Sequence, residues 1–374
     1  MTALWEKYRD EFPVTKNVVY LNHASVAPLS RRAAAAMQGL AQDALEFGSE
    51  HYSTWMASYE GVRNSAAQMI RAKANEIAIV KNTSEGIATV ARGLDWKRGD
   101  AVVIFEEEFP ANLYPWKRLA ATKGVELRQL SIFDDPQRID EAAKGARLVA
   151  ISFVQYLSGY RVNLDTIGEI CRRRGCFFFV DAIQGMGAFP IDVDRSGIHA
   201  LSADGHKWLL GPEGCGVLYI SREVQDEVDP VEFGWTNVAK YADYASRDMS
   251  LRSDAGRYEC GTLNTIGCFG LRTAFDLLLE IGVENVRPVV QSLGDQVWNG
   301  AREIGYETLG VRTVESGAGI VSVRKPGVES QFIVKKLREA GFATAPRQGW
   351  VRIAPHFYIS PDEIDALLRM LRTF

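Results

Sequence analysis

Short apolar runs alternate with longer amphipathic stretches through the first two thirds of the sequence. Four continuous apolar runs, of the length and character typical of strands buried on both faces, lie at 77–80, 101–105, 148–154 and 176–180. Three amphipathic stretches that predict helices lie between them, at 85–94, 113–123 and 163–174. We therefore expect an α/β protein, with a mainly parallel sheet of the seven-stranded type and helices on both of its faces.

Two local features refine this expectation. The apolar run at 215–220 predicts one more strand, and its short separation from residues 201–207 suggests a hairpin-like pair, which would make the sheet mixed. Asn163 or Asp165 is placed to cap the helix that follows it.

The pattern changes near Gly261. A long helical region covers about 266–304, and we expect interruptions near Gly282 and Pro288. The segments beyond it, typical of a smaller α+β domain, are strand-like runs at 319–325 and 350–356 and helices at 330–340 and from Pro361. We expect a large domain over residues 20–262, and a small domain made of residues 1–19 and 263–374 with a long linking helix at its start.

Composition and charge exclude several function classes. The formal net charge of −4 over 374 residues gives no basic field for nucleic acid. No apolar stretch reaches the roughly 20 residues that span a bilayer, and the polar start MTALWEKYRDEFP lacks a leader, so we expect a cytoplasmic protein without a membrane partner. The five cysteines fit neither a zinc site nor a disulfide framework; we expect reduced core thiols and no metal.

Polar residues follow several of the predicted strands, where parallel sheets bind their ligands. Thr83 and Ser84 open a helix directly after 77–80, so that free N–H groups and two hydroxyls favour a phosphate, although for this cluster alone a simple helix cap is the favoured interpretation. Phe109 follows 101–105 and suits stacking on a flat ring, although a loop aromatic that covers the core is the simpler interpretation.

Asp181 and Lys207 complete this set of polar residues. Asp181 ends an apolar run and needs a positive partner or donors there, for which a pyridinium nitrogen or a helix N-terminus would serve. Lys207 lies in the turn DGHKW before an apolar segment, and desolvation there would lower its pKa and favour imine chemistry. Most lysines are solvated surface groups, so neither residue is decisive alone.

The order of these features along the chain is more specific than any one of them. A phosphate turn, an aromatic residue, the motif DAIQ at 181–184 and the motif GHK at 205–207 follow one another. In this order the chain resembles the fold-type I pyridoxal-phosphate (PLP) enzymes, and specifically the class V aminotransferase family. That family includes cysteine desulfurases, selenocysteine lyases, isopenicillin N epimerase-like proteins and C–S lyases. The resemblance runs from the motif YLNHA at 20–24 to VRIAPHFY at 351–358.

The resemblance implies a role for each matching residue. Lys207 would hold PLP as a Schiff base and move the Cα proton. The cofactor would also be contacted by Thr83, Ser84, Phe109, Tyr156, Asp181, Gln184 and His206. Among them, Asp181 would pair with the pyridine nitrogen and Thr83, Ser84 and His206 would hold the phosphate. Thr262 would reach the phosphate of a partner subunit in a homodimer. The amino-acid substrate would be contacted by Asn22, His23, Arg347 and Arg352, with Arg352 on its carboxylate.

Two positions depart from the family. Asp204 stands where many relatives have Ser beside the phosphate, and a carboxylate there would repel the dianion, so we expect it to point elsewhere. Desulfurases carry a persulfide-forming cysteine before the carboxylate-binding arginine, whereas residues 341–352 read GFATAPRQGWVR. This absence favours a β-eliminating lyase or an aminotransferase over a desulfurase; an epimerase stays open. Arg347, in that loop, would contact a distal acidic group of the substrate or remain a solvated charge.

Two interpretations from other classes remain. Gly185 and Gly187 after a strand suggest a nicotinamide-dependent dehydrogenase, but the third glycine of that fingerprint would fall on Pro190. A non-catalytic protein of the PLP fold would carry a damaged site, whereas each principal position here holds a residue with workable chemistry.

Overall fold

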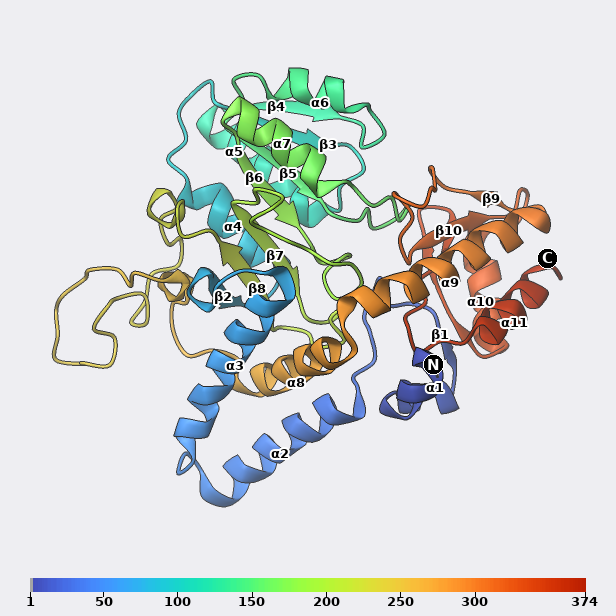
Figure 1. Ribbon diagram of the computed structural model, residues 1–374, viewed down its shortest axis with the longest axis horizontal. Coiled ribbons are helices and arrows are strands. Elements are labelled where there is room, and N and C mark those ends of the chain that lie inside the picture. Colours follow the sequence, from blue (N-terminus) through green and yellow to red (C-terminus); the bar gives the residue numbers. More distant parts are fainter. Residues whose placement is uncertain (1–2) are drawn as a thin grey trace.

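A seven-stranded sheet forms the centre of the computed structural model, which describes residues 3–374 (Figure 1). Its strands, in the order β2-β8-β7-β6-β5-β3-β4, are β2 (Ile77–Val80), β3 (Ala101–Phe105), β4 (Glu126–Leu130), β5 (Leu148–Ser152), β6 (Phe177–Asp181), β7 (Ala200–Asp204) and β8 (Gly216–Ile220). Within this sheet β8 alone runs antiparallel to its neighbours. The predicted mainly parallel sheet and its hairpin-like pair are confirmed.

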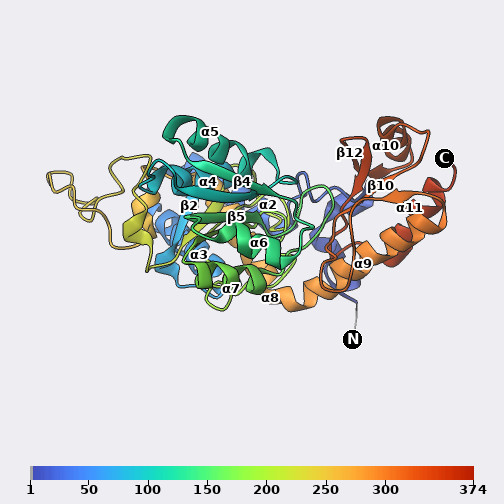
Figure 2. The same ribbon diagram turned by 90° about the horizontal axis from the view of Figure 1, so that it is seen from above.

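Helices cover both faces of this sheet, which buries two separate apolar cores (Figure 2). One face carries α4 (Thr83–Gly93) and α5 (Tyr114–Lys123). The opposite face carries α3 (Tyr52–Ile70), α6 (Pro136–Ala143), α7 (Leu164–Arg174) and α8 (Thr265–Ile281). Asn163 caps α7, as one of the two predicted candidates, by accepting a hydrogen bond from the Thr166 N–H at 3.2 Å.

Some elements were not predicted. β4 lies at the edge of the sheet, and its residues ELRQL are half-exposed or exposed, so the strand lacks the apolar run that marks its neighbours. α2 (Arg31–Phe47) and α3 form a long helical pair that packs on α8 (Figure 1). Both helices were missed because helices were predicted between apolar strand runs, and the first of these runs begins only at residue 77.

A second, four-stranded sheet lies beyond α8, in the order β12-β13-β10-β9. Its strands are β9 (Glu307–Thr308), β10 (Val321–Arg324), β12 (Ala345–Arg347) and β13 (Trp350–Ile353). The helices around it are α9 (Val283–Glu303), α10 (Ser330–Glu339) and α11 (Pro361–Leu371). The N-terminal segment, with α1 (Leu4–Tyr8), joins this part of the molecule: β1 (Val19–Tyr20) pairs with β11 (Phe342–Ala343), and Arg9 forms an ion pair with Glu363 at 2.8 Å.

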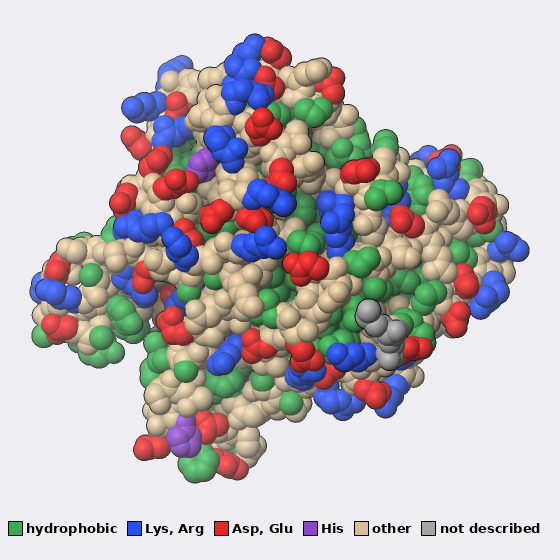
Figure 3. Space-filling view, viewed as in Figure 1, with side chains coloured by type: hydrophobic (Ala, Val, Ile, Leu, Met, Phe, Trp, Pro, Cys, Tyr) green, Lys and Arg blue, Asp and Glu red, His purple; other side chains and the backbone are tan. Residues whose placement is uncertain are grey.

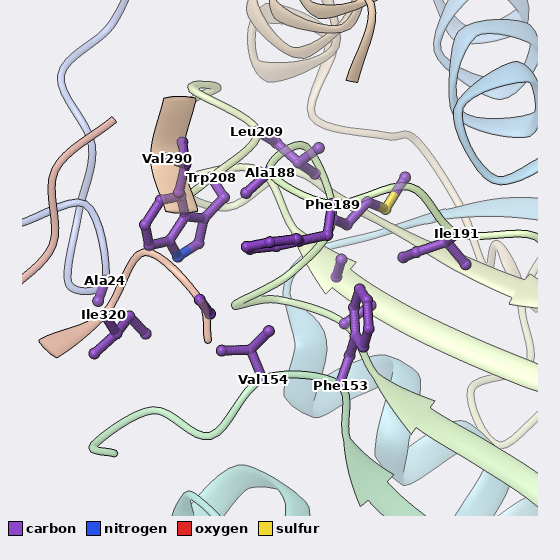
Figure 4. Packing of buried hydrophobic residues seen from close by; sticks show 14 of the residues in the cluster. Ala24, Phe153, Val154, Ala188, Phe189, Ile191, Trp208, Leu209, Val290 and Ile320 are labelled. Atoms are coloured by element: carbon purple, nitrogen blue, oxygen red, sulfur yellow. The ribbon is translucent and has the colours of Figure 1, made fainter. Parts of the chain in front are cut away.

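The passage between the two sheets runs through α8 and α9. Gly282, with φ of 80°, separates them as predicted, but the predicted break at Pro288 is wrong because α9 continues through it. Pro288 is the sixth residue of α9 and removes the single hydrogen bond that its N–H would make to the Glu284 carbonyl, while Val286 and Val290 on either side are fully buried. Figure 4 shows Val290 beside Trp208, the residue after Lys207, so α9 packs directly behind the lysine turn.

The surface carries charges of both signs. Figure 3 shows Lys and Arg side chains interspersed with Asp and Glu over the visible face. Within residues 3–374, no helix combines the length and the apolar character that crossing a membrane requires.

Candidate active site

A cavity of about 310 Å³ lies at the carboxyl ends of the parallel strands. Residues that follow β2, β3, β5, β6 and β7 line it, together with residues 24–26 and the β12–β13 hairpin. Ten of the predicted site residues lie on its wall: Thr83, Ser84, Phe109, Tyr156, Asp181, Gln184, His206, Lys207, Arg347 and Arg352. The shared edge of a parallel sheet thus brings together residues that are up to 269 positions apart in the sequence, from Thr83 to Arg352.

Lys207 is nearly buried in this wall. Its Nζ lies 5.5 Å from the centre of the Phe109 ring, and burial lowers its pKa to about 8, although Asp181 opposes that change. The turn that holds it is tight: a Cβ on Gly205 would lie 2.7 Å from the Cys215 carbonyl oxygen. Lys207 therefore has a substantial neutral fraction near neutral pH, as a nucleophile or base requires.

Asp181 is the last residue of β6 and is 2% exposed. Its Oδ1 accepts a hydrogen bond from the Ile183 N–H at 3.1 Å, and burial raises its pKa to about 6. Among residues 3–374, no arginine or lysine forms an ion pair with it. A buried carboxylate on a cavity wall without such a partner suits a cationic group inside the cavity.

The N-terminus of α4 forms another part of the wall. Asn82 caps the helix through the Glu85 N–H at 3.0 Å, so the N–H groups of Thr83 and Ser84 stand in the first turn, where an α-helix offers them no internal partner. Thr83 Oγ1 accepts a hydrogen bond from the Asp204 N–H at 3.0 Å, which leaves its own proton to donate. This turn suits a phosphate.

Asp204 turns towards a neighbouring imidazole. Its Oδ2 lies 3.0 Å from His206 Nδ1, within ion-pair distance. Although Asp204 also lines the cavity, this contact directs one of its carboxylate oxygens to His206.

Arg352 is held from two sides. Its Nη1 donates to the Tyr156 carbonyl oxygen at 2.8 Å and its Nη2 to Ser25 Oγ at 2.6 Å, while its buried Nε has no partner among the described residues. Arg347 Nη2 also donates to Ser25 Oγ, at 3.2 Å. Gln348 Nε2 donates to the Tyr156 hydroxyl at 2.9 Å, and the rings of Tyr156 and Phe109 meet edge to face at 5.2 Å.

Three predicted residues lie outside the cavity. His23 is fully buried: its Nδ1 contacts the Ala354 carbonyl oxygen at 2.8 Å and its Nε2 the Tyr358 hydroxyl at 2.5 Å. With both ring nitrogens engaged, His23 has no atom for a substrate, which corrects that prediction. Asn22 does not line the cavity and bridges to Ala354 through its backbone. Thr262 is exposed elsewhere on the surface, where only a partner subunit would give it the predicted role.

Other residues at this site escaped prediction. Ser25 receives both arginines, yet in the sequence it is one serine after the motif YLNHA. Trp208 Nε1 donates to Gln184 Oε1 at 2.8 Å, and Gln184 Nε2 donates to the Ala24 carbonyl oxygen at 3.0 Å, so the Gln184 amide has a fixed orientation. Glu108, the last of three consecutive glutamates, is buried beneath the site and accepts hydrogen bonds from the Ser152 N–H at 2.7 Å and from Gln155 Nε2 at 3.1 Å.

Comparison with known proteins identifies the family. The family described as Aminotransferase class-V matches residues 19–354. The chain belongs to the class V aminotransferase family. A probable cysteine desulfurase of Pyrococcus abyssi is 30% identical over 98% of this chain and 96% of its own length. An uncharacterized aminotransferase of Bacillus subtilis is 28% identical over 97% of this chain and 96% of its own. The structure of a cysteine desulfurase from Thermococcus onnurineus superimposes with a TM-score of 0.90 at 27% identity, over 98% of this chain and 97% of that one.

This class V protein is therefore a PLP-dependent enzyme that acts on an amino acid, with the fold-type I architecture. The residues present fit the cofactor. The cavity offers an amine at Lys207, a buried carboxylate without an ion-pair partner at Asp181 and free N–H groups at the start of α4, which match the aldehyde, the pyridine nitrogen and the phosphate of PLP.

Proposed function

We propose that this class V enzyme removes the Cα proton of an α-amino acid with Lys207, and that it is a β-eliminating lyase or an aminotransferase. One observation carries this proposal. The cavity joins the buried amine of Lys207 to a carboxylate-binding group at Arg352, and no thiol stands on its wall.

Lys207 and Arg352 act on different groups of the substrate. PLP, when bound, supplies an electron sink for the carbanion formed at Cα. Arg352 binds the α-carboxylate through a charge-assisted contact, for which its unpartnered Nε and the second N–H of each Nη remain. Lys207, whose burial keeps part of its amine neutral, accepts the Cα proton.

The other residues on the wall hold the cofactor. Asp181 pairs with the pyridine nitrogen, and Thr83, Ser84 and His206 bind the phosphate at the start of α4. Phe109 would cover the cofactor ring, and the Tyr156 ring meets the Phe109 ring edge to face. Gln184, fixed by Trp208 and Ala24, directs its remaining amide proton to the ring oxygen.

The positions of the cysteines favour this proposal over a desulfurase that forms a persulfide. Cys171, Cys176, Cys215 and Cys268 are buried, and Cys260, which departs from the predicted core position, is half-buried next to Glu232. None of the five lines the cavity, and residues 341–352 place Arg347 where a sulfur acceptor is expected. The cavity wall therefore offers no cysteine that could carry a persulfide.

A cysteine desulfurase that hands its sulfur directly to an external thiol is the second candidate, favoured by the names of the relatives. An epimerase uses the same first step. In β-elimination the Cα–H bond breaks and its proton goes to Lys207, the electron pair left at Cα forms the Cα=Cβ double bond, and X leaves with the pair of the Cβ–X bond.

The products distinguish these reactions. The purified holoenzyme is incubated with a panel of L-amino acids, including cysteine, cystine and the acidic amino acids. Each is tested with and without a 2-oxo acid that can accept the amino group, and cysteine is also tested with an excess of an external thiol that takes up the sulfur and releases it as sulfide. Pyruvate with ammonia indicates elimination, a 2-oxo acid that retains the substrate side chain indicates transamination, alanine with sulfide indicates desulfuration, and the D-enantiomer indicates epimerisation. A holoenzyme that converts no amino acid would favour a non-catalytic protein of the PLP fold and contradict the proposal.

We also propose that the active unit is a homodimer. Thr262 is exposed, and a small recess beside it carries Tyr52 and Trp235, which are 43% and 47% exposed. Exposed aromatic side chains around a residue expected to serve a partner's phosphate favour an interface between copies at this surface. Sedimentation of the holoenzyme tests this: a fully active monomer would contradict it.

A further inference from the structure

Arg347 and Arg352 share one face of the β12–β13 hairpin. The hairpin closes through Gln348 and Gly349, with φ of 47° and 83°, the positive values of a tight two-residue turn. Arg347 pairs with Trp350 and Arg352 with Ala345, so the two arginines lie diagonally across the pair on the same face. The fold therefore holds two positive side chains together rather than separating them.

The two guanidinium groups converge on one acceptor. Nη2 of Arg347 and Nη2 of Arg352 both donate to Ser25 Oγ, at 3.2 Å and 2.6 Å. Among residues 3–374, neither arginine forms an ion pair with a carboxylate. Arg324, on the neighbouring strand of the same sheet, differs because it forms an ion pair with Glu307, whose Oε2 lies 2.5 Å from Arg324 Nη2. Burial and the charge of Arg347 lower the pKa of Arg352 to about 10, as expected for a cation without a counter-ion.

The carboxylates on the cavity wall do not balance this pair. Asp181 lies at the end of β6, where it serves a cation in the cavity, and Asp204 lies 3.0 Å from His206. The α-carboxylate of one amino acid neutralises one guanidinium. Arg347, at the exposed mouth of the cavity, has no carboxylate partner among the described residues and is placed to bind a second anion.

We propose that the substrate is an amino acid with an acidic side chain, whose α-carboxylate binds Arg352 and whose distal acid binds Arg347. The inference rests on the proposed function, since it assigns the remaining wall of the same cavity. The acidic group is a carboxylate or a sulfur oxyacid on a side chain short enough for both acids to reach arginines that share one hydroxyl. Arg347 is solvent-exposed, so the distal acid of the substrate would bind at the mouth of the cavity.

Two non-reactive acids of matched length test this. Butanoate and butanedioate are titrated into the PLP-loaded enzyme at about 0.15 M ionic strength, where surface charges are screened. Binding is followed through the absorbance of the lysine-bound cofactor. We expect butanedioate to bind about two- to fivefold more tightly, the size of an ion pair to an exposed arginine. In Arg347→Gln the ratio of the two dissociation constants should fall towards one, and Arg347→Lys should recover part of it.

A matched control separates the local contact from overall charge. Arg195 is exposed, pairs with Asp165 at 3.1 Å and lies outside the cavity, so Arg195→Gln removes one positive charge and should leave the ratio unchanged. Equal binding of the two acids by the unaltered enzyme, or a preference that persists in Arg347→Gln, overturns the inference. If PLP produces no lysine-bound absorbance at all, the proposed function fails first, so the two failures are distinguishable.

Discussion

Replacing Asp181 with asparagine should stabilise the cofactor-free protein while it weakens the PLP-loaded one. Asn keeps the shape of the side chain and an oxygen for the Ile183 N–H, but it carries no charge. In the folded protein, burial raises the pKa of Asp181 from 3.8 to about 6, which corresponds to a cost of about 3 kcal/mol for the ionised form. The loaded enzyme loses the ion pair to the pyridine nitrogen.

The sign follows from proton linkage. An acid whose folded-state pKa is raised binds more protons when folded, so its ionisation reduces stability as the pH rises from about 4 through about 6. Above about pH 6 the folded protein bears the whole free-energy cost of the ionised Asp181 side chain. At pH 8 we expect the apparent Tm of cofactor-free Asp181→Asn to exceed that of the unaltered protein by a few degrees, since about 1 kcal/mol moves Tm by about 1 °C in a protein of 374 residues.

The assay is thermal unfolding at pH 8 with and without PLP. Asp140→Asn is the control of opposite sign. Arg174 and Arg173 hold the pKa of Asp140 far below its usual range, and the substitution removes the attraction within this half-buried ion pair. In Asp181→Asn the stabilisation by PLP should be smaller than in the unaltered protein. A cofactor-free Asp181→Asn that melts lower, or that gains as much from PLP as the unaltered protein, would refute this account of Asp181.

Further predictions concern the lysine, its titration and the helix start. Lys207→Ala should abolish the absorbance of lysine-bound cofactor and lower turnover by at least about a thousandfold, whereas activity near the unaltered level would contradict its role as base. The rate of PLP uptake should rise with pH through about 8, because burial lowers the pKa of Lys207 to that value and the neutral amine is the nucleophile; stopped-flow absorbance measures it, and a flat profile opposes the assignment. Gly86→Ala should destabilise the protein by about 1–3 kcal/mol, because its Cβ would lie 2.2 Å from Ser202 Oγ, and a second change of Ser202→Gly should restore most of the loss in denaturant titrations.

Central strands and the cavity wall were predictable because their physical constraints are local. β3 and β5 are buried on both faces, so every residue of them is apolar except Ser152 at the end of β5, and the functional residues follow where each strand ends. β4 was not predictable in this way, since an edge strand needs no apolar run.

The remaining errors come from contacts between distant segments. His23 and Tyr358 are 335 positions apart, and only their pairing in the core shows that His23 is unavailable to a substrate. Ser25 meets Arg352 across 327 positions, and nothing in its local sequence distinguishes it from other serines. α9 continues through Pro288 because the apolar face of the helix is packed on both sides of this residue. The free energy of that tertiary packing outweighs the loss of one hydrogen bond.

Reductive trapping tests the central claim most directly. The purified protein is incubated with PLP, reduced with borohydride and digested, and the modified peptide is identified by mass spectrometry. We predict that the pyridoxyl group is on Lys207, and that butanedioate leaves this position unchanged. A label on another lysine, or no label at all, would contradict the account.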